Sequence, residues 1–421
     1  MRKNVLLKLG KDTYNEALEE ANNLIGDFIE QTRNSDGNYT DLKTIFICDH
    51  ILLAENQDLK FIEAIESVFR SLLLFSNELL YAKNVDYISN LGMFVGVGNF
   101  SFSIWLFKRK RGSLKNMDEY YYQIIQRSIP QIVNDFENKK MDFILYDIIF
   151  GVSGLLNYML ERNDKESSNK LLNVLIEYSN PKEVNDCKTL GFHIERDQLI
   201  DPLDREYFVD GCLDLGMSHG IIGPAITMSK CFYENIGEKE MLLEAINRIT
   251  EIYTQNARYE DSIIKFPTRI ASYGETNKLK YHLSFNESWC YGNISIIWSL
   301  MKISRNLGRS KDYDYYLEEL VKVCNLAFED YNLDSSILCH GIAGVITIQL
   351  CAYDDTKDIR FLSSLKRNVT QLLNLHRTLN DKGDLNYKSW SSFLDGKGGV
   401  LLTLLNVLGD SNYYSKILMC N

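Results

Sequence analysis

The segments LGMSHGIIGPA (residues 215–225), SWCYGNISII (residues 288–297) and ILCHGIAGVI (residues 337–346) follow one pattern. A glycine is followed, usually three positions later, by a small residue and then by an apolar run with helical spacing. The same pattern occurs in GMFVGVGNF (92–100), LYDIIFGVSGLL (145–156) and SSFLDGKGGVLL (391–402). The first glycines of the six segments are Gly96, Gly151, Gly220, Gly292, Gly341 and Gly396. They recur at roughly 50 to 70 residues, a spacing typical of helical-hairpin repeats.

These glycine pairs predict an all-α fold. A glycine at the start of an inner helix lets two backbones approach closely and lets the chain turn sharply. Repeated around a ring, such hairpins form an α/α toroid, a double-layered helical barrel of about seven helical-hairpin repeats. The residues before 70 are expected to supply a degenerate hairpin, because their turn near 41–50 has lost its glycines. The glycine-bearing turns are expected to meet at one end of the ring.

Residues 1–421 are predicted to form a single toroid domain. Two stretches, 179–211 and 258–287, contain prolines and lack a clear period. We expect them to be loops or a small strand-containing extension between repeats.

The net charge of −11 excludes the basic surface that nucleic-acid binding requires. The first residues lack the cleavage site of a secretory signal, and the apolar stretch at 337–352 is too short and too polar to span a membrane. Nine scattered cysteines then fit a reducing compartment better than a disulfide framework. We therefore expect a cytoplasmic protein.

Cysteine and histidine gather just before the first glycines of three repeats. Cys290 precedes Gly292, and the adjacent Cys339 and His340 precede Gly341. Two thiolates and one imidazole suit Zn²⁺, which prefers sulfur and nitrogen ligands in tetrahedral geometry. Three protein ligands leave one position for water or substrate, as in catalytic zinc sites. Because two thiolates already neutralise the metal's charge, the site suits activation of a further thiol better than hydrolysis.

Three more residues lie on these turns. His219 is either a structural histidine or a general acid or base. Asp147 is either a helix N-cap or part of the active site. Tyr291 either packs beside Cys290 or acts in the chemistry. The other seven cysteines are predicted to be small core residues.

The motifs HGxxG (219–223), WCYG (289–292) and CHGxxG (339–344) resemble those of the lanthionine synthetase C-like family, the cyclases of class I lantibiotic biosynthesis. By repeat spacing, the resemblance covers about residues 90 to 405. It implies an α/α toroid with one zinc ion per chain on Cys290, Cys339 and His340. It also implies an active site containing His219, Asp147 and Tyr291.

The resemblance further implies a carbon–sulfur bond-forming cyclase of the lyase class. Such an enzyme adds cysteine thiolates to dehydroalanine or dehydrobutyrine in a dehydrated, leader-bearing precursor peptide. We expect His219 to accept the thiol proton or to protonate the enolate, with Asp147 orienting it and Tyr291 donating a hydrogen bond near the oxyanion. Family members work beside a dehydratase and an ABC exporter, associated with the inner face of the cell membrane.

The sequence departs from the family pattern at several positions. An arginine often precedes WCYG in the family, whereas Asn286 and Glu287 stand here. Phe150 stands where relatives carry a polar residue, and Asn99 replaces a second glycine. Substrate positioning is therefore expected to differ more than zinc binding.

Three other functions compete with this one. A family member outside antibiotic clusters would join glutathione or another thiol to modified proteins. A non-catalytic scaffold would bind peptides and use zinc only structurally. A thiol-alkylating toroid, as in protein prenyltransferases, would need a ligand set that WCYG and CHG do not resemble.

Overall fold

The computed structural model describes residues 3–34, 37–39, 41–56, 58–82, 90–94, 96–185, 187–271, 281–283, 286–382, 387, 389–390, 392–409 and 412–420. The chain divides into two compact units. Unit 1 combines Met1–Ile124 with Cys324–Asn421, and unit 2 is the continuous stretch Ile125–Val323. The prediction of a single domain over residues 1–421 stays a prediction.

Buried helices follow the glycine-bearing turns in unit 2, as the sequence predicts. They are α9 (Val152–Glu161), α12 (Ile222–Tyr233) and α14 (Asn293–Asn306). The glycines are needed for space. A Cβ on Gly292 would lie 2.0 Å from the Ser288 nitrogen, and one on Gly220 would lie 2.3 Å from the Gly216 nitrogen. Since the φ of Gly292 is −79°, which any residue adopts, close backbone approach is what requires glycine there.

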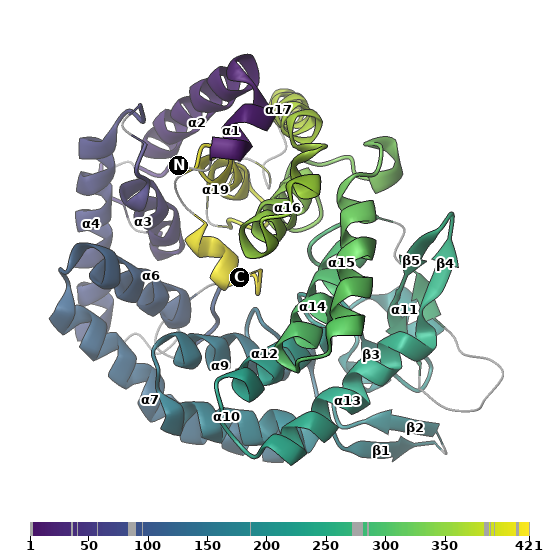
Figure 1. Ribbon diagram of the computed structural model, residues 1–421. Coiled ribbons are helices and arrows are strands. Elements are labelled where there is room, and N and C mark those ends of the chain that lie inside the picture. The colour runs from purple at the N-terminus through teal and green to yellow at the C-terminus, as the bar shows by residue number, and fades with distance from the viewer. Residues whose placement is uncertain are drawn as a thin grey trace. The chain divides into compact units, whose positions relative to one another are not determined.

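Amphipathic helices alternate with these buried helices. They are α7 (Lys115–Asn138), α10 (Lys165–Tyr178), α13 (Lys239–Asn256) and α15 (Ser310–Cys324). Within unit 2, α9 packs against α10, and α12 packs against α13 and α14 (Figure 1). In the pairs α9–α10 and α12–α13, a largely buried helix is therefore covered by a partner that has one apolar face.

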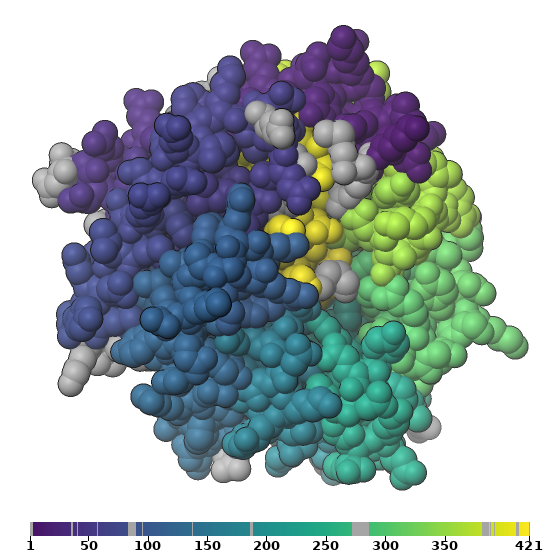
Figure 2. Space-filling model, turned by 60° about the vertical axis from the view of Figure 1, so that its left-hand side comes forward, coloured from purple at the N-terminus to yellow at the C-terminus, as the bar shows by residue number. Residues whose placement is uncertain are grey.

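Unit 1 contains the two ends of the chain. Its helices are α1 (Lys3–Leu9), α2 (Lys11–Gln31), α3 (Ile45–Leu53), α4 (Ile62–Tyr81), α6 (Gly96–Arg111), α16 (Ile342–Thr356), α17 (Leu365–Lys382) and α19 (Lys397–Val407). The last helix, α19, packs against α2, and the buried Lys397 ammonium contacts Asp27 at 2.6 Å. Figure 2 shows the N-terminal helices (purple) beside the α16–α17 segment (yellow-green), and α17 packs on both α1 and α2. Segments from both ends of the sequence therefore build one core.

The first hairpin has the glycine-free turn that the sequence predicts. A short 3₁₀ helix, η1 (Leu42–Thr44), takes the place of the glycine turn, and the Asp41 carboxylate accepts a hydrogen bond from the Lys43 backbone nitrogen. The following helix, α3, is buried along its whole length and packs against α4 and α6. A capped 3₁₀ turn thus replaces the close backbone contact made in the other repeats.

The two irregular stretches of the sequence contain the strands of unit 2. An antiparallel pair is formed by β1 (Pro181–Val184) and β2 (Cys187–Leu190), and another by β4 (Arg258–Glu260) and β5 (Ile263–Lys265). A three-stranded sheet has the order β3 (Leu213–Asp214), β6 (Pro267–Ile270), β7 (Tyr281–Leu283). The strands gather on one side of unit 2, to the right in Figure 1. The predicted strand-containing extension is therefore confirmed.

The extension has a small core of its own. Four buried residues, Ile194, Leu199, Phe208 and Cys212, pack together around η2 (Arg196–Gln198) and α11 (Pro202–Tyr207). Phe143, in the short helix α8 (Phe143–Tyr146), packs against this core. Further 3₁₀ helices are η3 (Glu329–Tyr331), η4 (Ile359–Leu362) and η5 (Tyr413–Lys416). Among the helices in the described ranges, none combines the length and apolar character of a membrane span.

Candidate active site

His219 lies on a tight turn between β3 and α12. The Gly220 nitrogen donates to the Gly216 carbonyl at 2.9 Å, which closes the turn. Asp214 stabilises both ends of this turn. Its carboxylate accepts a hydrogen bond from the Gly216 nitrogen and its carbonyl accepts one from the Ile221 nitrogen, both at 2.9 Å. The His219 side chain is 24% exposed, so part of the imidazole is accessible to solvent or substrate.

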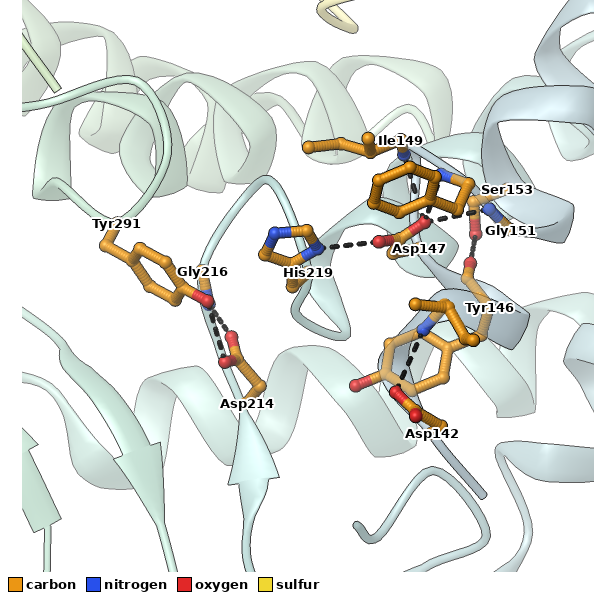
Figure 3. A network of polar contacts seen from close by, with 12 residues as sticks. Asp142, Tyr146, Asp147, Ile149, Gly151, Ser153, Asp214, Gly216, His219 and Tyr291 are labelled. Atoms are coloured by element: carbon orange, nitrogen blue, oxygen red, sulfur yellow. Dashed lines mark hydrogen bonds and ion pairs between the residues drawn. The ribbon is translucent and has the colours of Figure 1, made fainter. Parts of the chain in front are cut away.

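Asp147 faces His219 from the turn between α8 and α9. One carboxylate oxygen accepts the backbone N–H groups of Ile149, Phe150 and Gly151 at 3.0, 2.7 and 2.8 Å. The other lies 2.6 Å from Nδ1 of His219 (Figure 3). Asp147 thus binds the backbone of the turn between α8 and α9 and also contacts the histidine, whereas the N-cap residue of α9 is Gly151.

The Asp147–His219 pair favours a charged imidazole. Burial lowers the pKa of His219, but the hydrogen bond to Asp147 and its charge outweigh burial, so this pKa is raised overall. Burial raises the pKa of Asp147 overall, although its contacts with His219 and with backbone N–H groups act in the opposite direction. Because the carboxylate accepts four hydrogen bonds, its ionised form matches its surroundings. The Nδ1 atom of His219 then carries a hydrogen, and Nε2 is the atom that gains or loses a proton.

Aromatic rings surround the imidazole. The ring centre of Phe143 is 4.4 Å from that of His219, and Phe150 lies parallel to the imidazole at 6.5 Å. The ring of Tyr291 is also 6.5 Å away. Phe150 is 43% exposed, so it forms an apolar rim beside the histidine. This rim reduces the access of water to the imidazole.

The turn that carries Cys290 is tied directly to the His219 turn. The Cys290 carbonyl accepts the backbone N–H groups of Met217 and Ser218 at 2.7 and 3.3 Å. A Cβ on Gly216 would lie 2.4 Å from the Tyr291 ring, so only glycine leaves room for this tyrosine. The chain therefore fixes the positions of Cys290, Tyr291 and His219 relative to one another.

Tyr291 is bound through its hydroxyl group. It donates to the Asp214 carboxylate at 3.1 Å, and Nη2 of Arg269 lies 3.4 Å from the same oxygen. Burial and the charge of Asp214 hold the pKa of Tyr291 well above 10, so the phenol is neutral. Its ring does more than pack, because the hydroxyl links it to a buried carboxylate.

Cys339 and His340 precede α16 on the CHG turn. The Leu338 and Cys339 nitrogens both donate to the Leu394 carbonyl, at 3.1 and 3.0 Å, so the turn before α19 braces this one. Cys339 is half-buried and His340 is exposed. Both side chains are therefore accessible to a ligand.

Within the described ranges, one group of side chains is suited to hold a metal ion. It consists of Cys290, Cys339 and His340, whose ligand atoms all lie within 4.8 Å of one another. Two sulfurs and one imidazole nitrogen form a donor set that fits Zn²⁺. Six other cysteines, Cys48, Cys212, Cys231, Cys324, Cys351 and Cys420, are buried, in agreement with their prediction as core residues. The side chain of Cys187 lies outside the described part of the chain.

Three charged residues near the site were not predicted from the sequence. Asp214 lies only five residues before His219, a spacing that was available as a signal. Arg269 lies in a stretch read only as irregular, and nothing in its local sequence marks it. Glu287 was noted only for replacing an arginine. It is buried, contacts Lys265 at 2.6 Å and accepts the Ile294 nitrogen at 3.0 Å, so it supports the start of α14.

Comparison with known proteins identifies the family of this chain. Residues 58–419 match the family model of lanthionine synthetase C-like proteins. The chain is 24% identical over 345 residues to the nisin biosynthesis protein NisC of Lactococcus lactis subsp. lactis, with 78% of this chain and 79% of that protein covered.

A solved structure of a nisin cyclase matches with a TM-score of 0.75 at 18% identity, covering 96% of this chain and 97% of the other. This match confirms the predicted α/α toroid. The family model covers most of the sequence, including every motif discussed above. The chain therefore belongs to the lanthionine synthetase C-like family.

Proposed function

We propose that this protein is a zinc-dependent lanthionine cyclase of the carbon–sulfur lyase class. It would close thioether rings by adding cysteine thiolates to dehydroalanine or dehydrobutyrine within one dehydrated peptide. The observation that carries the proposal is the His219–Asp147 pair, held by backbone hydrogen bonds beside Cys290. Family membership and the relation to NisC support the same reaction.

Cys290, Cys339 and His340 would hold one zinc ion per chain. Their ligand atoms are close enough to share one ion, and three protein ligands leave a position for the substrate sulfur. When bound, zinc lowers the pKa of a coordinated thiol, so that the substrate cysteine is a thiolate at neutral pH. The partial exposure of Cys339 and His340 supports access by a peptide.

His219 would manage the protons of the addition. The substrate sulfur bonds to the β-carbon of the dehydro residue, the alkene π bond breaks, and its electron pair moves onto the adjacent carbonyl as an enolate. Nε2 of His219, protonated as an imidazolium, gives its proton to the α-carbon, and the proton released from the substrate thiol restores the imidazolium, so the addition consumes no external acid. Asp147 orients the ring through Nδ1 and stabilises the imidazolium, which the raised pKa of His219 supports.

Tyr291 would act near the developing oxyanion. Its hydroxyl hydrogen points to Asp214 at 3.1 Å, so donating to an enolate requires this hydrogen bond to open. Until then Tyr291 limits the space beside His219 and helps to exclude water. Phe143 and Phe150 would complete an apolar wall against the dehydro residue.

The substrate would be a leader-bearing precursor peptide whose serines and threonines have been dehydrated. A dehydratase must act before this enzyme, since the alkene is its reactant. An ABC exporter would remove the product, and the complex would form in the cytoplasm at the inner face of the membrane. The relationship to a nisin biosynthesis protein supports a peptide substrate.

The test is cyclisation of a dehydrated precursor peptide by purified, zinc-loaded protein, with free thiols counted by alkylation and mass spectrometry. We expect free thiols to disappear without a change in peptide mass, because the addition is internal. Adding glutathione to the same assay separates the alternatives. A mass gain of glutathione in place of ring closure would overturn the cyclase proposal in favour of a thiol transferase. If neither reaction occurs while the peptide still binds, the scaffold function replaces both.

A further inference from the structure

Arg269 contacts three polar groups around the candidate active site. Its Nε lies 3.1 Å from the Asp214 carboxylate, its Nη1 lies 2.7 Å from Asp204, and its Nη2 lies 3.4 Å from the Tyr291 hydroxyl. The guanidinium is also 5.4 Å from the centre of the Tyr291 ring. Arg269 therefore uses all three of its nitrogen atoms and one face of its guanidinium plane.

The backbone places Arg269 opposite Asp214. The two residues are register partners in the antiparallel pair β3–β6, so the sheet itself brings the charges together. Asp204 comes from α11, in the extension, and its side chain is 14% exposed. One arginine thus balances two carboxylates in a mostly buried setting, where an unpaired charge is costly.

Asp214 connects Arg269 to the turn that carries His219. One of its oxygens accepts from the Gly216 nitrogen, at the base of that turn, and the other accepts from the Tyr291 hydroxyl (Figure 3). The Asp214 side chain is 3% exposed. Arg269 is therefore the cation that neutralises the carboxylate on which both Tyr291 and the His219 turn depend.

We propose that Arg269 is a positioning residue, which fixes the Tyr291 ring directly and the His219 turn through Asp214. This inference rests on the proposed function, because it assigns a role in that same site. A planar guanidinium reaches two carboxylates and a phenol at once, whereas a lysine ammonium cannot match this geometry. Without Arg269, Asp214 and Asp204 would be two like charges without their shared cation, and the turn would lose its support.

The experiment compares Arg269→Gln and Arg269→Lys with Arg205→Gln. Arg205 is the matched control, since it lies in the same extension but binds the Leu199 carbonyl at 2.5 Å and, within the described residues, contacts neither Asp214 nor Tyr291. For each variant, zinc content, the melting temperature, and kcat and KM for cyclisation of a dehydrated precursor peptide are measured. Hydrogen–deuterium exchange of residues 213–221 provides a readout that does not depend on activity.

We expect Arg269→Gln to lower kcat about 10- to 100-fold per zinc-loaded molecule, because a misplaced turn costs rate rather than affinity. KM and zinc content should change less than threefold, and exchange at 213–221 should rise. Arg269→Lys should recover only part of kcat, and Arg205→Gln should behave as wild type.

Two outcomes would overturn the inference. One is unchanged exchange at 213–221 together with unchanged kcat in Arg269→Gln. The other is a lower melting temperature with normal kcat per folded molecule, which would make Arg269 a structural residue only. If wild-type protein fails to cyclise the peptide, the proposed function is lost, whereas the exchange data still decide whether Arg269 orders the turn.

Discussion

His50 lies inside the first buried helix, α3, whereas His219 lies on the turn before another buried helix, α12. Both have an aspartate close by, and both are bound through Nδ1. The Nδ1 of His50 contacts the Phe46 carbonyl at 2.7 Å, and its Nε2 has no partner within the described residues. The Nδ1 of His219 contacts the Asp147 carboxylate instead.

This difference shifts the pKa values of the two histidines in opposite directions. Burial lowers the pKa of His50 to about 4, although its backbone hydrogen bond acts the other way. Burial also raises the pKa of the adjacent Asp49 well above its ordinary value. Around His219 the carboxylate outweighs burial. His219 differs from His50 because its glycine-bearing turn places the imidazole beside a carboxylate and leaves it partly exposed, whereas His50 is fully buried.

The largest effect is expected at the cysteines. Cys48, beside Asp49, is buried with a pKa well above its ordinary value, so its thiol is inert. We expect Cys339→Ala to lose zinc and all detectable cyclisation, and Cys48→Ala to keep about one zinc ion per chain. Elemental mass spectrometry of both purified variants beside wild type measures this. A zinc-free wild type that cannot be reloaded would contradict the proposed mechanism.

The second-largest effect is expected when the imidazole is removed, and it should differ between His219 and His50. His219→Asn is expected to keep zinc but lower kcat about 10²- to 10⁴-fold, as for loss of a general acid–base group. His50→Gln should leave kcat per folded molecule unchanged. Single-turnover assays with saturating peptide compare the two. Unimpaired cyclisation by His219→Asn would remove the histidine from the mechanism.

The pH dependence should distinguish the neighbours of His219. If the imidazolium delivers the proton, kcat falls as pH rises through its pKa, which is raised above the ordinary 6.5. Asp147→Asn removes the charge that favours the imidazolium, so the falling limb should move to lower pH and kcat at pH 8 should drop. A pH profile from 5.5 to 9 on both proteins tests this. A limb that stays in place would mean that another group titrates.

The smallest effect is expected in the pH dependence of the free energy of unfolding, to which His50 contributes. Its folded pKa of about 4 lies below the ordinary 6.5, so the unfolded chain binds the extra proton between these values. The free energy of unfolding should therefore decrease as pH falls from 6.5 to 4, by about 3 kcal/mol at roughly 1.4 kcal/mol per pKa unit. His50→Phe should lack this contribution. Urea denaturation of both proteins at pH 7 and pH 4.5 gives the difference, and parallel losses would contradict the assignment.

The repeats and the grouping of Cys290, Cys339 and His340 were predictable because they depend on local chemistry. Glycine is required wherever a Cβ would clash with the preceding backbone. Gly220 and Gly292 therefore mark the close turns of the fold in the sequence itself. The pairing of Asp147 with His219 was expected from family resemblance, and the contact is present. Its backbone hydrogen bonds could not be read from the sequence, since an N-cap and an active-site aspartate look alike there.

Arg269 was not predictable, because its partners depend on strand register. Asp214 and Arg269 are 55 residues apart in the chain, and only the pairing of β3 with β6 brings them together. Short strands carry little periodic signal, so the extension could be expected without its register. Long-range ion pairs of this kind lie beyond single-sequence reasoning.

The packing of α19 on α2 has a consequence for synthesis. Unit 2 is one continuous stretch and can complete its core as soon as residue 323 has left the ribosome. Unit 1 must wait, because its first helices are made at the start of translation and their partner helix is made at the end. The part of α2 that packs on α17 and α19 therefore stays uncovered for most of translation, which gives chaperones time to bind there.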